Sequence, residues 1–233
     1  MVGPLETKRE LVAIEKLVNE DVAVDSGHVA ELKASLELAG QIAPVVVQDG
    51  SFRIIDGFHR VAALGLMGRT GVECVVVSCD DETFWDLRIM SAVLHKSVAF
   101  ARAAEWIEES FKASGWVGRY RSAFHMFDGY AHSELKPDAR EWVEGKCAKW
   151  GPKPRTIASW LEIGQRLDPS LLAEAKSPPS IGDERALGFS HYKHVAHVLP
   201  HDHSMQRAVI KKAHEEKLSE IQTQEVAKAV RDA

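Results

Sequence analysis

Residues 54–64 read Ile-Ile-Asp-Gly-Phe-His-Arg-Val-Ala-Ala-Leu, which predicts a short strand, a tight turn and a helix. The first residues are β-prone, Asp56-Gly57 is typical of a turn, and apolar residues recur at helical spacing from Phe58 to Met67. The first N–H groups of a helix have no partner within the helix and lie at its positive dipole end. We therefore expect a phosphate to bind where this helix begins, at Gly57 and Phe58.

Arg60 strengthens this expectation, because its guanidinium carries a fork of donors that suits phosphate oxygens. The spacing is not that of a P-loop, which reads G-x-x-x-x-G-K-[ST]. An ordinary strand-to-helix turn with a solvated arginine fits the same residues. The stretch by itself leaves both interpretations open.

The surrounding sequence predicts a small α/β or α+β domain, and we expect α+β, with a small mixed sheet and helices. Asp49-Gly50 lies between two apolar runs and is a strong hairpin signal. A helix is expected up to Gly40, with Asp25 or Ser26 as its N-cap. Strands are expected at 11–14, 44–47, 53–55 and 72–77, and helices at 29–39 and 58–67.

From residue 81 onward the apolar spacing is purely helical, which predicts an all-α second domain. The least regular part, 115–135, is interpreted as a linker or a pair of weakly patterned helices. We place the first domain at 1–97 and the second at 98–233. Helices are expected at 81–95, 99–111, 138–150, 156–167, 190–197, 205–217 and 222–230.

Within the second domain, residues 138–167 have the layout of a helix-turn-helix, two helices joined by a short Gly/Pro turn. Its second helix begins with residue types that contact phosphates and base edges in DNA. A plain helical hairpin has the same pattern. The expected DNA-contacting residues are Lys153, Arg155, Thr156 and Ser159.

Composition is that of an ordinary soluble protein, with 45% apolar residues and a net charge of −5. No apolar run is long enough to span a membrane, so we expect a cytoplasmic protein without a membrane partner. Three cysteines outside any C-x-x-C pair indicate reduced thiols. Residues 1–111 hold 10 Lys/Arg against 18 Asp/Glu, which makes the front half a poor DNA-binding surface.

The order of elements resembles the ParB/sulfiredoxin-like superfamily, and within it ParB-like DNA-binding proteins. The resemblance covers about residues 11–104 and centres on Asp56-Gly57-Phe58-His59-Arg60-x-Ala62-Ala63, which is similar to the ParB phosphate-binding box. A second, collinear resemblance is to the ParB helix-turn-helix, carried by 154–158 and 189–191. Antibiotic-cluster regulators with a ParB domain and free-serine kinases share the Asp-Gly-x-His-Arg form.

The resemblance implies a nucleotide such as CTP or ATP, possibly with Mg²⁺, bound by Gly57, Phe58, His59, Arg60 and Ala62. It also implies double-stranded DNA as a partner, a homodimer, and a role in partition or transcriptional regulation.

Three departures from known members of the superfamily bear on this expectation. His59 replaces an arginine of the ParB box. Ala92 stands where ParB proteins have an asparagine that helps to hold Mg²⁺, and alanine offers no oxygen ligand. Metal-assisted hydrolysis is therefore in doubt, at most a weak NTPase activity, while nucleotide binding is less affected. Phe58 stands where sulfiredoxin has its cysteine, which excludes sulfinic acid reduction.

Two other activities compete with this interpretation. A phosphotransferase similar to free-serine kinases would need a carboxylate base, for which Glu20 and Asp56 are the candidates. A ParB-like nuclease would need clustered acids with metal spacing, which we do not find. The histidines at 191, 194, 197, 201 and 203 lack a cysteine partner, and we predict no structural zinc site.

Overall fold

The structure is a computed structural model that describes residues 5–19, 24–95, 100–175 and 187–232. The chain divides into two compact units, Met1–His95 and Lys96–Ala233. The expected domain boundary between residues 97 and 98 lies outside the described residues. Among the described residues, no helix is both long and apolar enough to cross a membrane.

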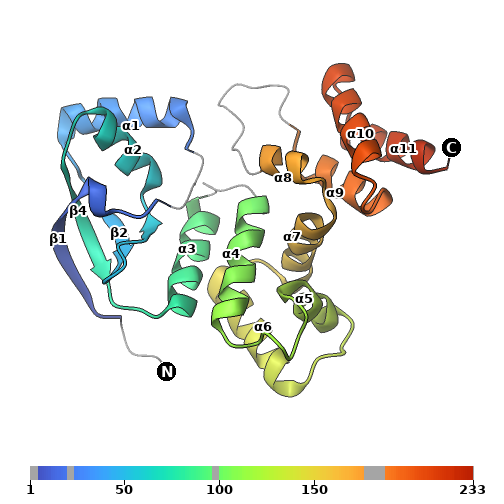
Figure 1. Ribbon diagram of the computed structural model, residues 1–233, viewed down its shortest axis with the longest axis horizontal. Coiled ribbons are helices and arrows are strands. Elements are labelled where there is room, and N and C mark those ends of the chain that lie inside the picture. The colour runs from blue at the N-terminus through green and yellow to red at the C-terminus, as the bar shows by residue number, and fades with distance from the viewer. Residues whose placement is uncertain (1–4, 20–23, 96–99, 176–186, 233) are drawn as a thin grey trace. The chain divides into compact units, whose positions relative to one another are not determined.

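The front unit is built on a four-stranded mixed sheet with the order β1-β4-β2-β3 (Figure 1). β2 and β4 run parallel, whereas β1 pairs with β4 and β3 pairs with β2 in the antiparallel sense. This is the mixed sheet that the sequence predicts. The strands are β1 (Thr7–Ala13), β2 (Val45–Gln48), β3 (Ile54–Asp56) and β4 (Gly71–Val77).

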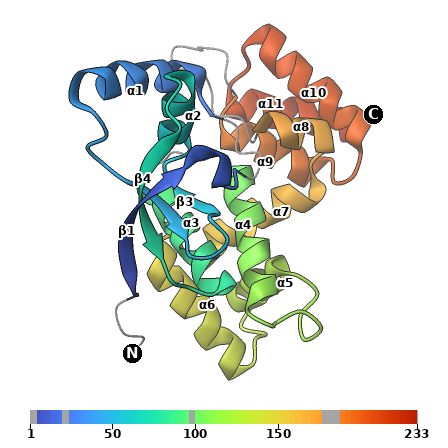
Figure 2. The same ribbon diagram turned by 60° about the vertical axis from the view of Figure 1, so that its left-hand side comes forward.

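Alternate residues of the strands face two helices, α1 (Ser26–Ala39) and α2 (Phe58–Leu66), and these side chains form the core of the front unit. The strand β2 alternates in this way, with Val45 and Val47 fully buried in that core. Burying one such side chain stabilises a fold by about 1.5–3 kcal/mol. The helix α3 (Asp81–His95) contacts β3 (Figure 2). The described buried residues of that core come from the strands, α1 and α2.

In the described residues of the back unit, every element longer than an isolated β-bridge is a helix, and the helices are joined by turns and loops. The predicted helix-turn-helix segment contains α6, which ends at Trp150, and α7, which begins at Pro154. Gly151 closes α6 with a φ of 96°, a conformation that suits glycine. The helices are α4 (Phe100–Ala113), α5 (Ala123–Ala131), α6 (Pro137–Trp150), α7 (Pro154–Arg166), α8 (Pro169–Ala175), α9 (Phe189–Val198), α10 (His203–Glu216) and α11 (Glu220–Arg231).

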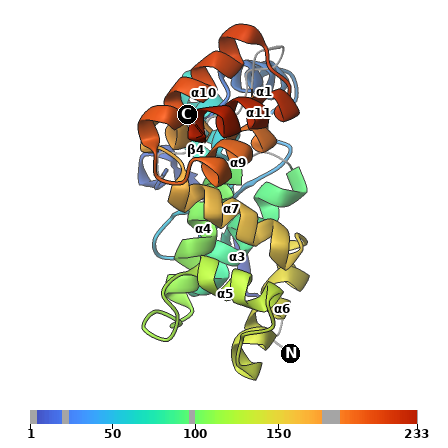
Figure 3. The ribbon, with the colours of Figure 1, turned by 90° about the vertical axis from the view of Figure 1, so that its right-hand side faces the viewer.

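The helix α7 is the centre of the back unit. It contacts α4, α5 and α9, and Figure 3 shows it between the α5–α6 pair and the group α9–α11. Its inner residues Ile157, Leu161 and Ile163 are at most 2% exposed. Elsewhere on α7, the side chains of Arg155, Thr156 and Gln165 are exposed at the surface.

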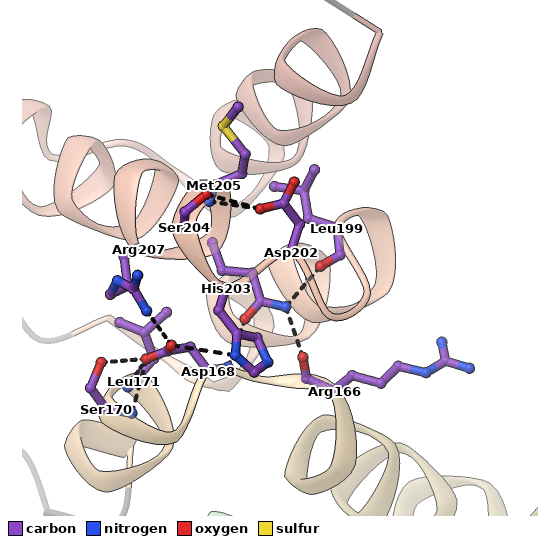
Figure 4. Close-up of polar contacts among 11 residues, drawn as sticks. Arg166, Asp168, Ser170, Leu171, Leu199, Asp202, His203, Ser204, Met205 and Arg207 are labelled. Carbon is purple, nitrogen blue, oxygen red and sulfur yellow. Dashed lines mark hydrogen bonds and ion pairs between the residues drawn. The ribbon is translucent and has the colours of Figure 1, made fainter.

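A buried glutamine joins the end of α7 to α10. The Gln206 amide donates to the carbonyl oxygens of Arg166 (2.7 Å) and Leu199 (2.8 Å), and its oxygen accepts the Asp168 N–H at 2.6 Å. The Asp168 carboxylate caps α8 and pairs with Arg207 (Figure 4). Each buried polar group of the cluster thus has a partner, as a stable interior requires.

The predictions made from the sequence differ from the structure at two places in the back unit. The segment 115–135 contains one described helix, α5, with Ser122 as its N-cap. The sequence analysis also missed α8, which follows α7 after Leu167 and Asp168. A seven-residue helix is too short to show a helical period, whereas its Asp-Pro start is a recognisable N-terminal signal.

All three cysteines are free thiols in the structure.

Candidate functional site

The turn between β3 and α2 depends on Gly57, which has φ 104° and ψ 22°. A Cβ atom at this position would lie 3.1 Å from Val45 Cγ2 and 3.3 Å from Val45 Cα. Both the left-handed backbone and the close approach to β2 therefore require glycine. The turn aims the first N–H groups of α2, from Phe58 to Arg60, away from the helix body.

Two helix N-termini meet at His59, and only one of them is capped by a side chain. The Asp25 carboxylate accepts the N–H groups of Gly27 (2.7 Å) and His28 (3.2 Å) at the start of α1. The start of α2 has no such side-chain cap among the described residues. An anion can therefore use the free donors of α2, whereas those of α1 are satisfied.

Arg60 holds the turn together through three hydrogen bonds. Its Nη1 donates to the carbonyl oxygens of Ala43 (3.0 Å) and Pro44, and its Nη2 donates to Asp56 Oδ2 at 2.6 Å. The other carboxylate oxygen, Asp56 Oδ1, accepts the Ser91 hydroxyl of α3 at 2.8 Å. Arg60, Asp56 and Ser91 thus form a chain from α2 to α3, which we call the Asp56 triad.

The Asp56 triad changes how Arg60 can serve a phosphate. Both terminal nitrogens are engaged internally, so a phosphate would have to compete with Asp56 for the guanidinium. The Arg60 and Asp56 side chains are 19% and 27% exposed, which leaves them within reach of a ligand. The sequence analysis did not identify Ser91 as a partner of Asp56, although the helical spacing of Phe84, Arg88 and Ser91 places the serine on the inner side of α3.

His59 is held in its neutral form. Its Nε2 accepts the backbone N–H of Asp25 at 3.2 Å, and its ring packs edge-on against His28 with centroids 5.0 Å apart. Burial, followed by the nearby His28, lowers the pKa of His59, while Asp25 and Asp56 oppose the shift. His59 therefore orients the junction of α1 and α2 and does not replace the fixed charge of an arginine.

The remaining residues of the predicted phosphate site have different surroundings. The Phe58 side chain is 7% exposed, with the buried Arg88 guanidinium 4.8 Å from its ring, so only its backbone can face a ligand. Ala62 packs against the core of the front unit. Ala92 is 5% exposed and has no oxygen to offer, but it adjoins Ser91. Glu20, the other candidate base, lies outside the described residues.

The predicted DNA-contacting residues lie at the start of α7. Lys153, Arg155 and Thr156 are exposed, with Lys153 as N-cap and Pro154 as the first helical residue. Ser159 is half-buried, and its hydroxyl donates to the Arg155 carbonyl oxygen at 3.0 Å. This arrangement presents two cations at a helix N-terminus, as a DNA-reading helix requires.

A groove of about 530 Å³ extends this surface from α7 to α5, α9 and α11. The sequence analysis did not predict that α9 lines a groove with α7, since it weighed the histidines of α9 mainly as metal ligands. The helical spacing of Lys193, His194 and His197 could have indicated that these three side chains share one face of α9. The lining residues are Phe124, Asp128, Ala131, His132, Arg155, Ala158, Ser159, Glu162, Lys193, His194, His197 and Gln224.

Acids partly balance the charge of this groove. His197 Nδ1 lies 3.6 Å from Glu162, and His132 Nδ1 lies 3.7 Å from Asp128. Burial lowers the pKa of His194. Among the described residues, no group of three or more His, Cys, Asp or Glu side chains could hold a metal ion.

The solved structures named here share at most 16% sequence identity with the chain. Solved structures similar to the chain include a pNOB8-like ParB N-domain (14% identity, 99% of this chain, 97% of the other, TM-score 0.49). Two others are C-terminally truncated ParB from Caulobacter crescentus. One is complexed to the centromeric parS site, with 16% identity, 94% of this chain and 99% of the other covered, and a TM-score of 0.44. The other is complexed with CTP-gamma-S, with 15% identity, 87% of this chain and 99% of the other covered, and a TM-score of 0.34.

A search of curated proteins found no match. The model of the ParB N-terminal domain family matches residues 8–93, which include all four strands, α1, α2 and most of α3. Residues 8–93 of this chain therefore form a ParB-like N-terminal domain.

Proposed function

We propose that this protein binds a nucleoside triphosphate, CTP or a related nucleotide, through the front unit and double-stranded DNA through the back unit. The observation that carries the first part is the uncapped start of α2 at Gly57, which lies within a ParB-like N-terminal domain. The N–H groups of Phe58, His59 and Arg60 would hold the phosphates. Arg60 would supply the positive charge after release from Asp56.

The second part of the proposal rests on the α6–α7 pair. Two helices of suitable length are joined by Gly151, Pro152 and Lys153, and the exposed start of α7 carries Lys153 and Arg155. In this proposal α7 enters the major groove and the protein binds DNA as a homodimer. A protein with these partners would act in partition or transcriptional regulation in the cytoplasm.

A thermal-shift panel tests the nucleotide site, because a ligand that binds only the folded state raises the melting temperature. The panel contains CTP, ATP, GTP and ADP, each with and without Mg²⁺ and duplex DNA. One charge-assisted hydrogen bond contributes about 1.5–3 kcal/mol. Arg60→Ala should therefore weaken nucleotide binding by roughly ten- to a hundredfold. Unchanged affinity in this variant would remove Arg60 from the site.

The phosphotransferase is the alternative, and the geometry does not favour it. Asp56 would have to act as the base, yet without a ligand its two carboxylate oxygens are bound by Arg60 and Ser91, and even after release from Arg60 one of them accepts the Ser91 hydroxyl. A base must instead be able to reach the proton of the substrate hydroxyl. Incubation with ATP or ADP and free serine, followed by detection of phosphoserine, distinguishes this alternative from a binding protein.

A further inference from the structure

The back unit has a second hollow, of about 450 Å³, between the start of α5, the end of α7 and the turn from α9 to α10. We call it the α5–α7 pocket. Its volume lies in the range of small-molecule sites, about 300–1,000 Å³. None of the described residues that line it is acidic, and four of them are basic, namely Arg121, His125, Arg166 and His201.

The positive charge of the α5–α7 pocket is available to a ligand. In the described part of the chain, the Arg121 and His201 side chains have neither a hydrogen bond nor an ion pair. Arg166 donates from Nη1 to Glu162 Oε1, which leaves the hydrogens of its Nε and Nη2 for another acceptor. A guanidinium in a hollow without acidic walls favours an anion, because it donates a fork of hydrogen bonds to carboxylate or phosphate oxygens.

Ser122 fixes the tautomer of neutral His125. The Ser122 hydroxyl oxygen accepts the Gln165 Nε2–H at 3.2 Å and the His125 backbone N–H at 3.5 Å, and these two bonds use both of its lone pairs. The hydroxyl hydrogen therefore goes to His125 Nδ1, which lies 2.9 Å away. Neutral His125 then carries its own hydrogen on Nε2, where it can donate to an anion.

The donors of the α5–α7 pocket are side chains and not the start of a helix. Ser122 caps α5, and Glu108 of α4 accepts the Ala123 N–H at 3.2 Å. The half-buried Phe124 adds an apolar surface, with its ring edge-on to His125 at a centroid distance of 5.7 Å. Cations beside an aromatic ring suit an anion that carries an organic group.

We propose that the α5–α7 pocket binds a small organic phosphate. Arg121, His125, Arg166 and His201 hold the phosphate oxygens, and the organic group rests on Phe124. A phosphate monoester has three terminal oxygens for donors that come from three parts of the fold, whereas a carboxylate has two. This inference depends neither on the nucleotide site at α2 nor on DNA binding at the start of α7.

NMR of the histidine ring nitrogens and isothermal titration calorimetry of the full chain test the proposal, with phenyl phosphate and inorganic phosphate as probes. Phenyl phosphate should shift the ring signals of His125 and His201 and leave those of His132, which lines the other groove, in place. It should also bind more tightly than inorganic phosphate, because only phenyl phosphate has a ring to place against Phe124.

Two variants and a control show whether the binding belongs to this pocket. Arg121→Ala should weaken binding of phenyl phosphate by at least about fivefold, the lower range for a charge-assisted bond at an exposed position. His201→Asn should weaken it by about threefold, since asparagine accepts the left-handed backbone of His201 (φ 66°) but lacks the imidazole. Lys211→Gln removes an exposed charge elsewhere on the back unit and should bind as the wild type does.

The proposal is wrong if about 10 mM phenyl phosphate, enough to fill most of a millimolar site, leaves the His125 and His201 signals unmoved. It is also wrong if Arg121→Ala and Lys211→Gln weaken binding equally. If a random-sequence duplex shifts these signals and phenyl phosphate does not, the pocket belongs to the DNA surface and the proposal fails. Thermal unfolding of each variant confirms that the titrated protein is folded.

Discussion

The Arg60 guanidinium and the Asp56 carboxylate form an ion pair of 2.6 Å across the turn that starts α2. Arg60 also binds two carbonyl oxygens, those of Ala43 and Pro44, and so fixes the segment that leads into β2. Arg60 is therefore part of the fold even if no ligand is present. The proposed ligand would use an arginine that already has a structural role.

Arg60→Ala should destabilise the front unit, because it leaves Asp56 and two carbonyl oxygens without this donor. The expected loss in the free energy of unfolding is about 1–2 kcal/mol, the lower part of the range for charged hydrogen bonds since the pair is partly exposed. Urea unfolding followed by circular dichroism measures it. Arg69→Ala, an exposed arginine just beyond α2, is the matched control and should change stability by less than about 0.5 kcal/mol. Equal losses in the two variants would contradict the role given to Arg60.

Two glycines of the same region should respond in opposite directions to alanine. Gly57→Ala places a Cβ against Val45 in a left-handed backbone, and we expect a loss of about 1–3 kcal/mol. Gly65→Ala adds a Cβ with no heavy atom within 4 Å on α2, and we expect a gain of at most about 1 kcal/mol. Thermal unfolding of both variants measures the difference. A stable Gly57→Ala protein would show that the turn tolerates another conformation.

The pKa of His59 predicts how the front unit responds to acid. Burial lowers this pKa in the folded protein, so the unfolded chain takes up the proton first as the pH falls below about 6.5. The stability from neutral His59 is therefore present above that pH and is lost as the pH falls through the pKa of the folded state.

His59→Gln should lose less stability than the wild type between pH 7 and pH 5, measured by urea unfolding at several pH values. The exposed His132, on the back unit, provides the control through His132→Gln. If the two variants show the same pH dependence as the wild type, protonation of His59 is not linked to folding.

Local patterns predicted most elements of the fold. The N-cap at Asp25, one of two residues predicted for it, and the Gly40 stop depend on residues adjacent in sequence, and the structure confirms both. Asp49-Gly50 lies in a turn between β2 and β3 as predicted, but the loop runs from residue 49 to residue 53 and is longer than a two-residue hairpin. The long-range partners of Arg60 and Asp56 could not be predicted in this way. Ala43 lies 17 positions from Arg60 and Ser91 lies 35 positions from Asp56, so both contacts depend on how the segment before β2 and the helix α3 pack.

Gln206→Leu should destabilise the back unit by about 2–4 kcal/mol. A leucine fills a similar volume but leaves the Asp168 N–H and the carbonyl oxygens of Arg166 and Leu199 buried without this partner, and each unsatisfied group costs about 1–3 kcal/mol. Urea unfolding followed by tryptophan fluorescence reports on this unit, which holds five of the six tryptophans. Gln165→Leu, at an exposed position of α7, is the control. A loss of the same size there would show that the hydrogen bonds of Gln206 are not the cause.

DNA binding should depend on both sides of the groove between α7 and α9. Arg155 and Lys193 line it from different helices, so a duplex contacted by one is within reach of the other. Lys193→Gln should lower the slope of log K against log salt by about 0.9 for one lost phosphate contact. Arg155→Ala should weaken binding by roughly tenfold or more, since a contact with a base or phosphate contributes about 1–3 kcal/mol.

Fluorescence anisotropy with a random-sequence duplex at several salt concentrations measures both effects without knowledge of a specific site. Lys211→Gln, at a lysine of α10 whose side chain is 76% exposed, is the matched control and should leave the salt slope unchanged. If Lys193→Gln and Lys211→Gln reduce binding equally, the DNA responds only to the net charge of the back unit. If Arg155→Ala has no effect while the wild type binds, the DNA surface lies elsewhere than at the start of α7.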